Sequence, residues 1–168
     1  LGMSEVEAGV LLTPWPLATM VSAPLAGKLI ERVHAGVLGC VGLVLLSGGL
    51  FLLAILADAS PVWEIALFIG LCGFGFGLFQ TPNNSILISS APPARSGGAS
   101  GMLGMARLTG QTTGASLVAL MFVLFVEDGT YASLYLAGGF ALLAAIVSIS
   151  RITLPEPEVL RVRPHGKK

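Results

Sequence analysis

Five polar side chains lie within long apolar stretches of this chain, where they could bind or guide a polar ligand. They are Gln80, Asn83, Asn84, Arg107 and Gln111. Inside a membrane, such groups hydrogen-bond across helix contacts or mark the path of a substrate. We therefore expect all five to line a substrate path or cavity. Arg107 is expected to donate hydrogen bonds to Gln80, Asn83 or Asn84. The alternative for Arg107 is that its long side chain reaches out to the membrane surface.

Glycines follow the same helix faces as these polar residues. The first stripe consists of Gly70, Gly73, Gly77, Gln80 and Asn84, and the second of Ser100, Gly104, Arg107, Gln111 and Gly114, with Gly110 continuing the second face. Residues at these spacings share one face of a helix. Small residues let membrane helices approach closely. The favoured interpretation is that the glycines pack helices together, and a transport path along the same faces is the alternative.

Trp15 stands between two prolines, Pro14 and Pro16, in the first apolar stretch. A proline inside a helix frees a carbonyl and kinks the helix, which membranes tolerate where neighbours or a cavity satisfy the backbone. Tryptophan usually prefers the membrane surface, whereas this one is expected near mid-depth. It should either pack between helices or line a ligand cavity.

The composition is that of an integral membrane protein. Of the 168 residues, 54% are hydrophobic and 11% are charged, against about a quarter charged in a soluble domain. Several uncharged runs are long enough to cross a bilayer as helices. We predict an all-α membrane bundle over residues 1–153, with five helices at about 6–27, 35–57, 63–90, 98–126 and 132–150. Residues 154–168 are predicted to be a disordered tail, because prolines make them a poor helix.

Several other classes of protein are not expected. The formal net charge is zero, which gives no overall attraction to nucleic acid. Cys40 and Cys72 both lie in apolar runs and fit no disulfide or metal pattern, and no cofactor is implied. An intramembrane enzyme would need a nucleophile with a base, or metal ligands, at depth. Both histidines, His34 and His165, lie outside the apolar runs.

The Lys and Arg residues outside the apolar runs all fall on one side of this five-helix arrangement, and six of the nine acidic residues fall on the other. One side carries Lys28, Arg32, Arg95, Arg151 and the basic residues of the tail, and the other carries Glu5, Glu7, Asp58, Glu64, Glu127 and Asp128. Because cytoplasmic loops are enriched in Lys and Arg, the basic side is predicted to be cytoplasmic. We expect a multi-pass protein of the plasma (inner) membrane, with its N-terminus outside and its C-terminus in the cytoplasm.

Three stretches resemble the C-terminal part of a major facilitator superfamily transporter, most closely the fourteen-helix drug:proton antiporter family. Gly27, Glu31 and Arg32 resemble the superfamily's cytoplasmic loop motif, although His34 and Ala35 depart from it. Residues 73–77 (GFGFG) with 81–84 (TPNN) resemble a Gly-rich helix of that family, and residues 99–114 resemble its next helix. The resemblance covers roughly residues 2–153. It implies that the five helices form most of the C-terminal six-helix bundle.

The resemblance also implies a function. It suggests a C-terminal fragment of a secondary exporter that exchanges protons for small amphipathic or cationic compounds. One helix and the whole N-terminal half of the transporter are then expected to precede Leu1. The implied partners are the lipid bilayer, that missing half, the substrate and the proton.

Proton coupling needs a titratable group at depth, and no Asp, Glu or His lies inside an apolar run. Arg107 cannot serve, because its guanidinium stays charged. The proton-binding carboxylates are therefore expected in the missing part. The alternative function is a stand-alone five-span membrane subunit or scaffold with no transport of its own, whose glycine stripes would be assembly surfaces.

Overall fold

The computed structural model describes residues 4–56, 59–89, 91–92 and 96–150, and all of its regular structure is helical. The helices are α1 (Glu5–Leu12), α2 (Pro14–Leu29), α3 (Ala35–Leu56), α4 (Val62–Ser89), α5 (Ser96–Leu124) and α6 (Gly129–Ser150). The predicted all-α fold is therefore confirmed. The predicted tail, residues 154–168, lies outside the described residues.

Most of these helices can cross a membrane. Within the described residues, four stretches are long and apolar enough, namely Glu5–Leu29 (α1 with α2), α3, α4 and α6. The fifth predicted span, α5, has 29 residues, but its part up to Gly114 is rich in glycine and contains Arg107 and Gln111, which lower its hydropathy. Large apolar side chains such as Met20, Leu67 and Ile146 are exposed on the outside of the bundle, as contact with lipid requires.

The first predicted helix is divided at Thr13 into α1 and α2. Pro14 and Pro16 carry no N–H, so the carbonyls of Val10 and Leu12, four residues earlier, lose their helical donors. The Thr13 N–H donates to the Val10 carbonyl (3.1 Å), and the Thr13 hydroxyl donates to the Gly9 carbonyl (3.2 Å). Two missing donors within three residues therefore end one helix and start the next.

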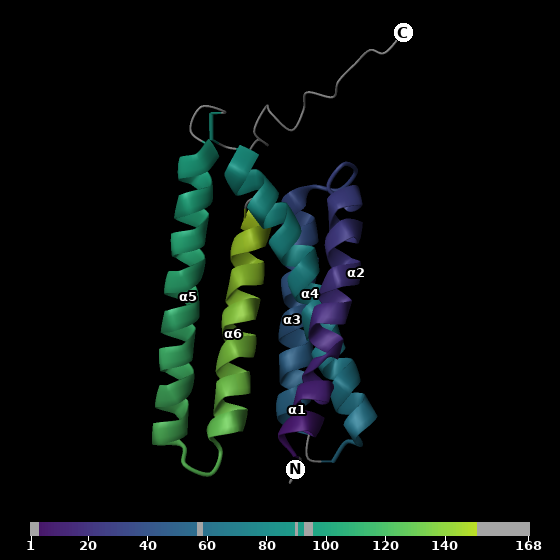
Figure 1. Cartoon of the computed structure of the whole chain (residues 1–168), viewed down its shortest axis with the longest axis vertical. Helices are drawn as coiled ribbons and strands as arrows, with labels where there is room; N and C mark the ends of the chain where they lie inside the picture. Colours follow the sequence, from purple (N-terminus) through teal and green to yellow (C-terminus); the bar gives the residue numbers. More distant parts are fainter. Residues whose placement is uncertain (1–3, 57–58, 90, 93–95, 151–168) are drawn as a thin grey trace.

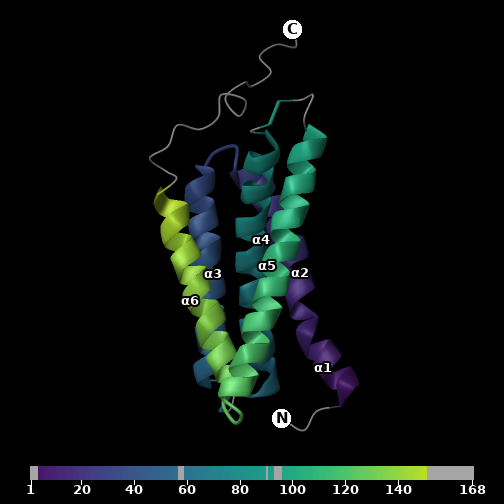
Figure 2. The same ribbon diagram turned by 90° about the vertical axis from the view of Figure 1, so that its left-hand side faces the viewer.

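The helices run side by side in the order α2, α4, α3, α6 and α5 (Figures 1 and 2). α3 contacts α4 on one side and α6 on the other, α2 packs on α4, and α5 lies beside α6. Apart from Arg107, the described charges lie at the two ends of the bundle. We call one the acidic end, with Glu5, Glu7, Glu64, Glu127 and Asp128, and the other the basic end, with Lys28, Glu31 and Arg32.

Glycines bring α3 and α4 into backbone contact. A Cβ atom on Gly42 would lie 2.5 Å from the Gly75 carbonyl oxygen, and a Cβ atom on Gly75 would lie 2.5 Å from the Gly42 carbonyl oxygen. About two turns further along α3, a Cβ atom on Gly49 would lie 2.5 Å from the Cys72 Sγ. No side chain fits at these positions, so the two helices can be this close only because the residues are glycines.

Buried serines join α3 to α6. The Ser47 hydroxyl donates to the Gly138 carbonyl (2.8 Å), and the Ser148 hydroxyl donates to the Gly36 carbonyl (3.0 Å). Both serines are buried, with 2% and 8% of their surface exposed. Interhelical hydrogen bonds of this kind stabilise membrane helix pairs by about 0.6 kcal/mol each on average.

The Gly42–Gly75 contact predicts opposite outcomes for two substitutions in α3. Gly42→Ala should lower the stability of the protein in detergent by about 1–3 kcal/mol, because the added methyl group overpacks the contact with α4. Gly48→Ala is the matched control, since nothing lies within 4 Å of a Cβ atom there, and it should be neutral or slightly stabilising. Thermal unfolding followed by circular dichroism checks this, and equal melting temperatures for the two variants would contradict it.

Candidate functional site

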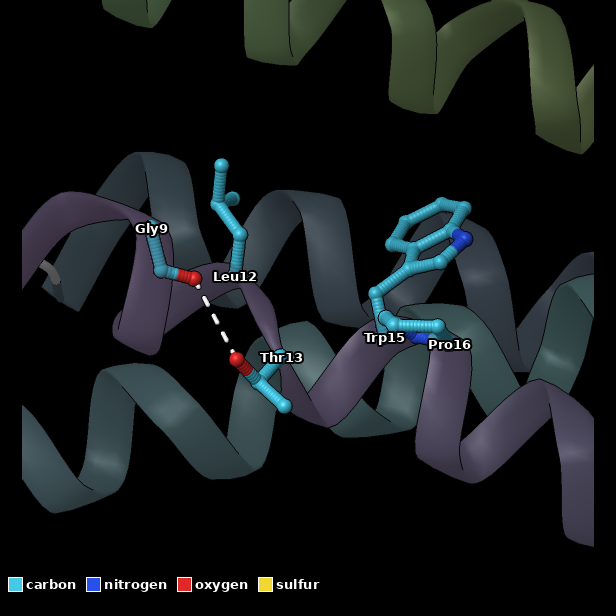
Figure 3. Close-up of a pocket in the computed structure, with 5 residues that line it drawn as sticks. All are labelled: Gly9, Leu12, Thr13, Trp15 and Pro16. Atoms are coloured by element: carbon cyan, nitrogen blue, oxygen red, sulfur yellow. Dashed lines mark hydrogen bonds between the residues drawn. The ribbon is translucent and has the colours of Figure 1, made fainter. Parts of the chain in front are cut away.

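An open hollow of about 450 Å³ lies beside the break between α1 and α2. Its lining is mostly apolar and consists of Gly9, Leu12, Thr13, Trp15 and Pro16. The Leu12 and Trp15 side chains project from the same side of the break (Figure 3). Thr13 lies about 12 Å along the helix axis from Glu5, so the hollow opens well inside a hydrocarbon core of about 30 Å.

The break beside the hollow leaves one backbone carbonyl without a helical donor. Pro16 cannot donate to the Leu12 carbonyl, and no backbone N–H of the described residues takes its place. The Thr13 hydroxyl is already engaged with the Gly9 carbonyl, as the dashed line in Figure 3 shows. A carbonyl left without a donor in lipid costs several kcal/mol. Such a break is therefore stable where water, another protein segment or a ligand lines it.

Trp15 both packs between helices and lines this hollow. Its ring lies 5.8 Å from the Phe76 ring of α4, centre to centre, at a tilt of 41°. Its backbone lies directly on Gly73, where a Cβ atom would collide with the Trp15 carbonyl. The Thr19 hydroxyl lies 2.9 Å from the carbonyls of both Trp15 and Gly73. The break is thus fixed against α4 on one side, while the ring borders the hollow.

The glycine stripe of α4 is a helix contact with α2. A Cβ atom on Gly70 would lie 3.6 Å from the Pro14 Cβ, and one on Gly77 would collide with the Ser22 hydroxyl. Together with Gly73, the structure brings this predicted stripe against one neighbouring helix. The polar residues that continue it, namely Gln80, Asn83 and Asn84, are half-buried in the last third of α4.

The corresponding stripe on α5 has no described helix opposite it. Nothing lies within 4 Å of a Cβ atom on Gly104, Gly110 or Gly114, and Arg107 and Gln111 are exposed. α5 has no buried residue at all among its described positions, because its main contact is with α6.

The hydrogen bonds expected from Arg107 are not formed within the described residues. No bond joins Arg107 to Gln80, Asn83 or Asn84, and no described residue accepts from its guanidinium. Gly104, Gly110 and Gly114 likewise contact no other described helix, so their expected role in helix packing stays a prediction.

The predicted loop motif lies at the basic end. Gly27 is in the last turn of α2, and nothing lies within 4 Å of a Cβ atom there. Glu31 and Arg32 are exposed in the following turn, where the N–H groups of Arg32 and Val33 donate to the Leu29 carbonyl at 2.9 Å and 2.8 Å. The structure places Gly27 at the end of α2 and Glu31 and Arg32 in the turn that follows, without an ion pair between Glu31 and Arg32.

Sequence reasoning found Trp15 but missed the residues that make the hollow around it. Leu12 was detectable, because the carbonyl four residues before a proline always loses its donor. In the described part of the chain, no group of three His, Cys, Asp or Glu side chains is placed to hold a metal ion.

Comparison with known proteins gives the family. A model described as "Major Facilitator Superfamily" matches residues 1–168. An uncharacterized transporter of Escherichia coli K12, YebQ, is 60% identical over 159 residues, which cover 92% of this chain and 34% of that protein. A tetracycline resistance determinant of Streptomyces rimosus is 35% identical over 123 residues, covering 72% of this chain and 35% of that protein.

A further relative points the same way. The multidrug resistance protein Stp of Mycobacterium tuberculosis is 31% identical over 117 residues, covering 70% of this chain and 22% of that protein. The chain thus spans about a third, or less, of the length of these relatives. No solved structure matches it significantly. With a matching family model over its whole length and apolar helices that can span a bilayer, the chain belongs to the major facilitator superfamily of membrane transporters.

Proposed function

We propose that this chain is the C-terminal part of a secondary active exporter of small amphipathic or cationic compounds, driven by proton exchange. In this proposal it resembles the fourteen-helix drug:proton antiporters, moves its substrate unchanged and performs no enzymatic reaction. Relatives named for tetracycline and multidrug resistance support the substrate class.

The hollow beside the α1–α2 break is the observation that carries this proposal. Its apolar lining suits the apolar body of an amphipathic compound, and the unpaired Leu12 carbonyl can accept a hydrogen bond from a substrate N–H. The Trp15 ring can in addition attract a cation. Secondary transporters hold their substrates near the middle of the membrane, often beside discontinuous helices, and this break lies at a comparable depth.

Arg107 and Gln111 remain proposed residues of the substrate path. They share the exposed face of α5, and we propose that the rest of the transporter covers this face. A charged residue on a transmembrane helix normally faces protein or a water-filled cavity, which is consistent with such a position.

Replacing Trp15 should weaken transport. In the full-length protein, reconstituted in liposomes with a pH gradient, Trp15→Ala should raise the half-saturating concentration of a fluorescent cationic dye such as ethidium about tenfold. That loss corresponds to about 1.4 kcal/mol, in the range of an aromatic contact. Trp15→Phe keeps a ring and should change the half-saturating concentration by about threefold or less.

The other tryptophan provides the matched control for this experiment. Trp63, near the start of α4, is 63% exposed and lies at the acidic end, so Trp63→Ala should leave dye transport unchanged. If Trp15→Ala transports the dye like the wild type, the hollow is not part of the substrate path. If no variant, and no wild-type protein, moves any cationic dye, the exporter proposal itself fails.

The groups that couple transport to protons are proposed to lie in the rest of the protein. In the described helices, acidic side chains occur only near the two ends, as with Glu7 in the first turn of α1 and Glu64 in the first turn of α4. None reaches the middle of the bilayer, where a coupling group must load and release its proton.

The 168-residue chain alone should therefore show no proton-driven transport. When it is reconstituted in liposomes with a pH gradient, a fluorescent cationic dye should move no faster than in empty liposomes. The full-length protein in the same liposomes is the positive control. Dye movement by the 168-residue chain that collapses when the gradient is abolished would contradict the prediction and favour a function for this chain on its own.

The proposed orientation places the basic end in the cytoplasm and the acidic end outside the plasma (inner) membrane. It can be read from single cysteines in a variant that lacks Cys40 and Cys72. Ser60→Cys and Thr130→Cys, at the acidic end, should react with an impermeant maleimide added to intact cells. Ser96→Cys, at the basic end, should react only after the cells are opened. Labelling of Ser96→Cys in intact cells would reverse the orientation or change the number of spans.

A further inference from the structure

The hydroxyl group of Thr19 connects α2 to α4 beside the break. Its oxygen lies 2.9 Å from the Trp15 carbonyl oxygen, one turn earlier in α2, and 2.9 Å from the Gly73 carbonyl oxygen in α4. A threonine hydroxyl carries a single hydrogen, so it donates to one of these carbonyls at a time or shares the hydrogen between them. Donation to Trp15 stays within α2, whereas donation to Gly73 joins two helices. One side chain thus contacts both the backbone that carries the Trp15 ring and the backbone of the neighbouring helix.

Gly73 allows this contact, and Thr19 holds it. A Cβ atom on Gly73 would collide with the Trp15 carbonyl, so a side chain there would push α2 away from α4. The missing side chain permits the approach, but it does not select one position of α2 along α4. A hydrogen bond depends on distance and direction, so the Thr19 hydroxyl favours one position. The hydroxyl therefore sets the register of the two helices at the break.

The other side of the break gives Trp15 little support. α1 has no buried residue, and the missing N–H groups of Pro14 and Pro16 leave two carbonyls of α1 without their helical donors. The Thr13 hydroxyl donates to the Gly9 carbonyl and so stays on the α1 side. The position of the Trp15 backbone therefore depends on the contact between α2 and α4.

The Trp15 ring carries this position into the hollow. The ring projects from the same side of the break as Leu12 (Figure 3), and it lies 5.8 Å from the Phe76 ring, centre to centre. Phe76 follows Gly73 by three residues on α4, so a shift of α2 along α4 would change the backbone contact and the ring contact together. Binding groups work best when supporting residues hold them within about 0.5 Å of the productive position. Thr19 does not line the hollow, so its effect on a ligand passes through Trp15.

We propose that Thr19 is a positioning residue for Trp15, and that its hydroxyl sets the affinity of the hollow for the substrate. This inference rests on the proposed function, since it takes the hollow at the α1–α2 break as part of the substrate path. Thr19→Val keeps the shape of the side chain and removes the hydroxyl, whereas Thr19→Ser keeps the hydroxyl. These two variants separate the hydrogen bond from the packing of the side chain.

Transport by the full-length protein measures the effect. In liposomes with a pH gradient, Thr19→Val should raise the half-saturating concentration of ethidium about threefold or more, the loss expected for one interhelical hydrogen bond. The maximal rate should stay within about twofold of the wild type, because the lost interaction acts on binding. Thr19→Ser should behave like the wild type. If Thr19→Val folds poorly, Thr19→Ala takes its place, since it removes the hydroxyl without adding apolar volume.

Ser47 provides the matched control. Its hydroxyl also donates to a glycine carbonyl on a neighbouring helix, that of Gly138 in α6, at 2.8 Å. Ser47 lies on α3 and does not line the hollow. Ser47→Ala should therefore lower the stability in detergent as Thr19→Val does, but it should leave the half-saturating concentration unchanged. An equal rise in the two variants would assign the effect to lost stability and overturn the proposal.

A double variant shows whether Thr19 acts through Trp15. Trp15→Ala should raise the half-saturating concentration about tenfold. Adding Thr19→Val should raise it no further, because the ring that Thr19 holds is already gone. Independent effects would multiply, to about thirtyfold. A thirtyfold rise, or wild-type transport by Thr19→Val, contradicts positioning through Trp15.

A spectroscopic measurement separates this inference from the proposed function. The full-length protein is labelled with fluorotryptophan, and the fluorine NMR resonance of Trp15 is identified by its absence from Trp15→Phe. Thr19→Val should shift or broaden that resonance, whereas Thr19→Ser and Ser47→Ala should leave it in place. An unchanged resonance in Thr19→Val would show that Thr19 does not position the ring. A shifted resonance combined with normal dye transport by Trp15→Ala would support the positioning role but remove the hollow from the substrate path.

Discussion

Contact between glycine backbones holds the centre of this bundle together. Lipid tails are as apolar as leucine, so membrane helices gain little by burying apolar side chains against one another. What remains is close packing, and the Gly42–Gly75 contact brings two backbones as near as helices allow. The Ser47 hydrogen bond joins α3 to α6, and the Gly73–Trp15 contact joins α4 to α2. Small residues therefore also attach the neighbouring helices to this pair. The arrangement of four helices follows from positions that carry almost no side chain.

The same packing explains where the break between α1 and α2 can lie. α2 is in contact with α4 from Pro14 through Ser22, so its start is fixed. α1, in contrast, has no buried residue. The unpaired Leu12 carbonyl therefore lies where a firmly packed helix meets a loosely packed one. Tight packing on one side of the break and open space on the other are what give the hollow both a defined shape and access.

The sequence predicted the helices and the identity of the small-residue faces, because composition and helical spacing are local properties. It did not predict which helix each of these faces contacts. The glycines of α4 and of α5 have the same spacing, yet Gly73 touches α2 and Gly110 touches nothing. The prolines show the same limit. Pro14 and Pro16 together divide a helix, whereas Pro82 removes one donor, is buried and leaves α4 continuous. For the candidate site, the flanking prolines singled out Trp15 as a candidate, while the hollow beside it became visible only in the structure.

The exposure of α5 has a consequence for how the protein enters the membrane. Arg107 lies about 17 Å from the start of this helix, and insertion scales put an arginine at the centre of a span at about 2.5–3.5 kcal/mol. Its glycines and polar residues add little affinity for lipid. During synthesis, α5 must then be retained by the helices made just before and after it, as one arm of a hairpin with the strongly apolar α4 and α6. The order of helices along the chain thus places the weakly apolar α5 between two strongly apolar neighbours.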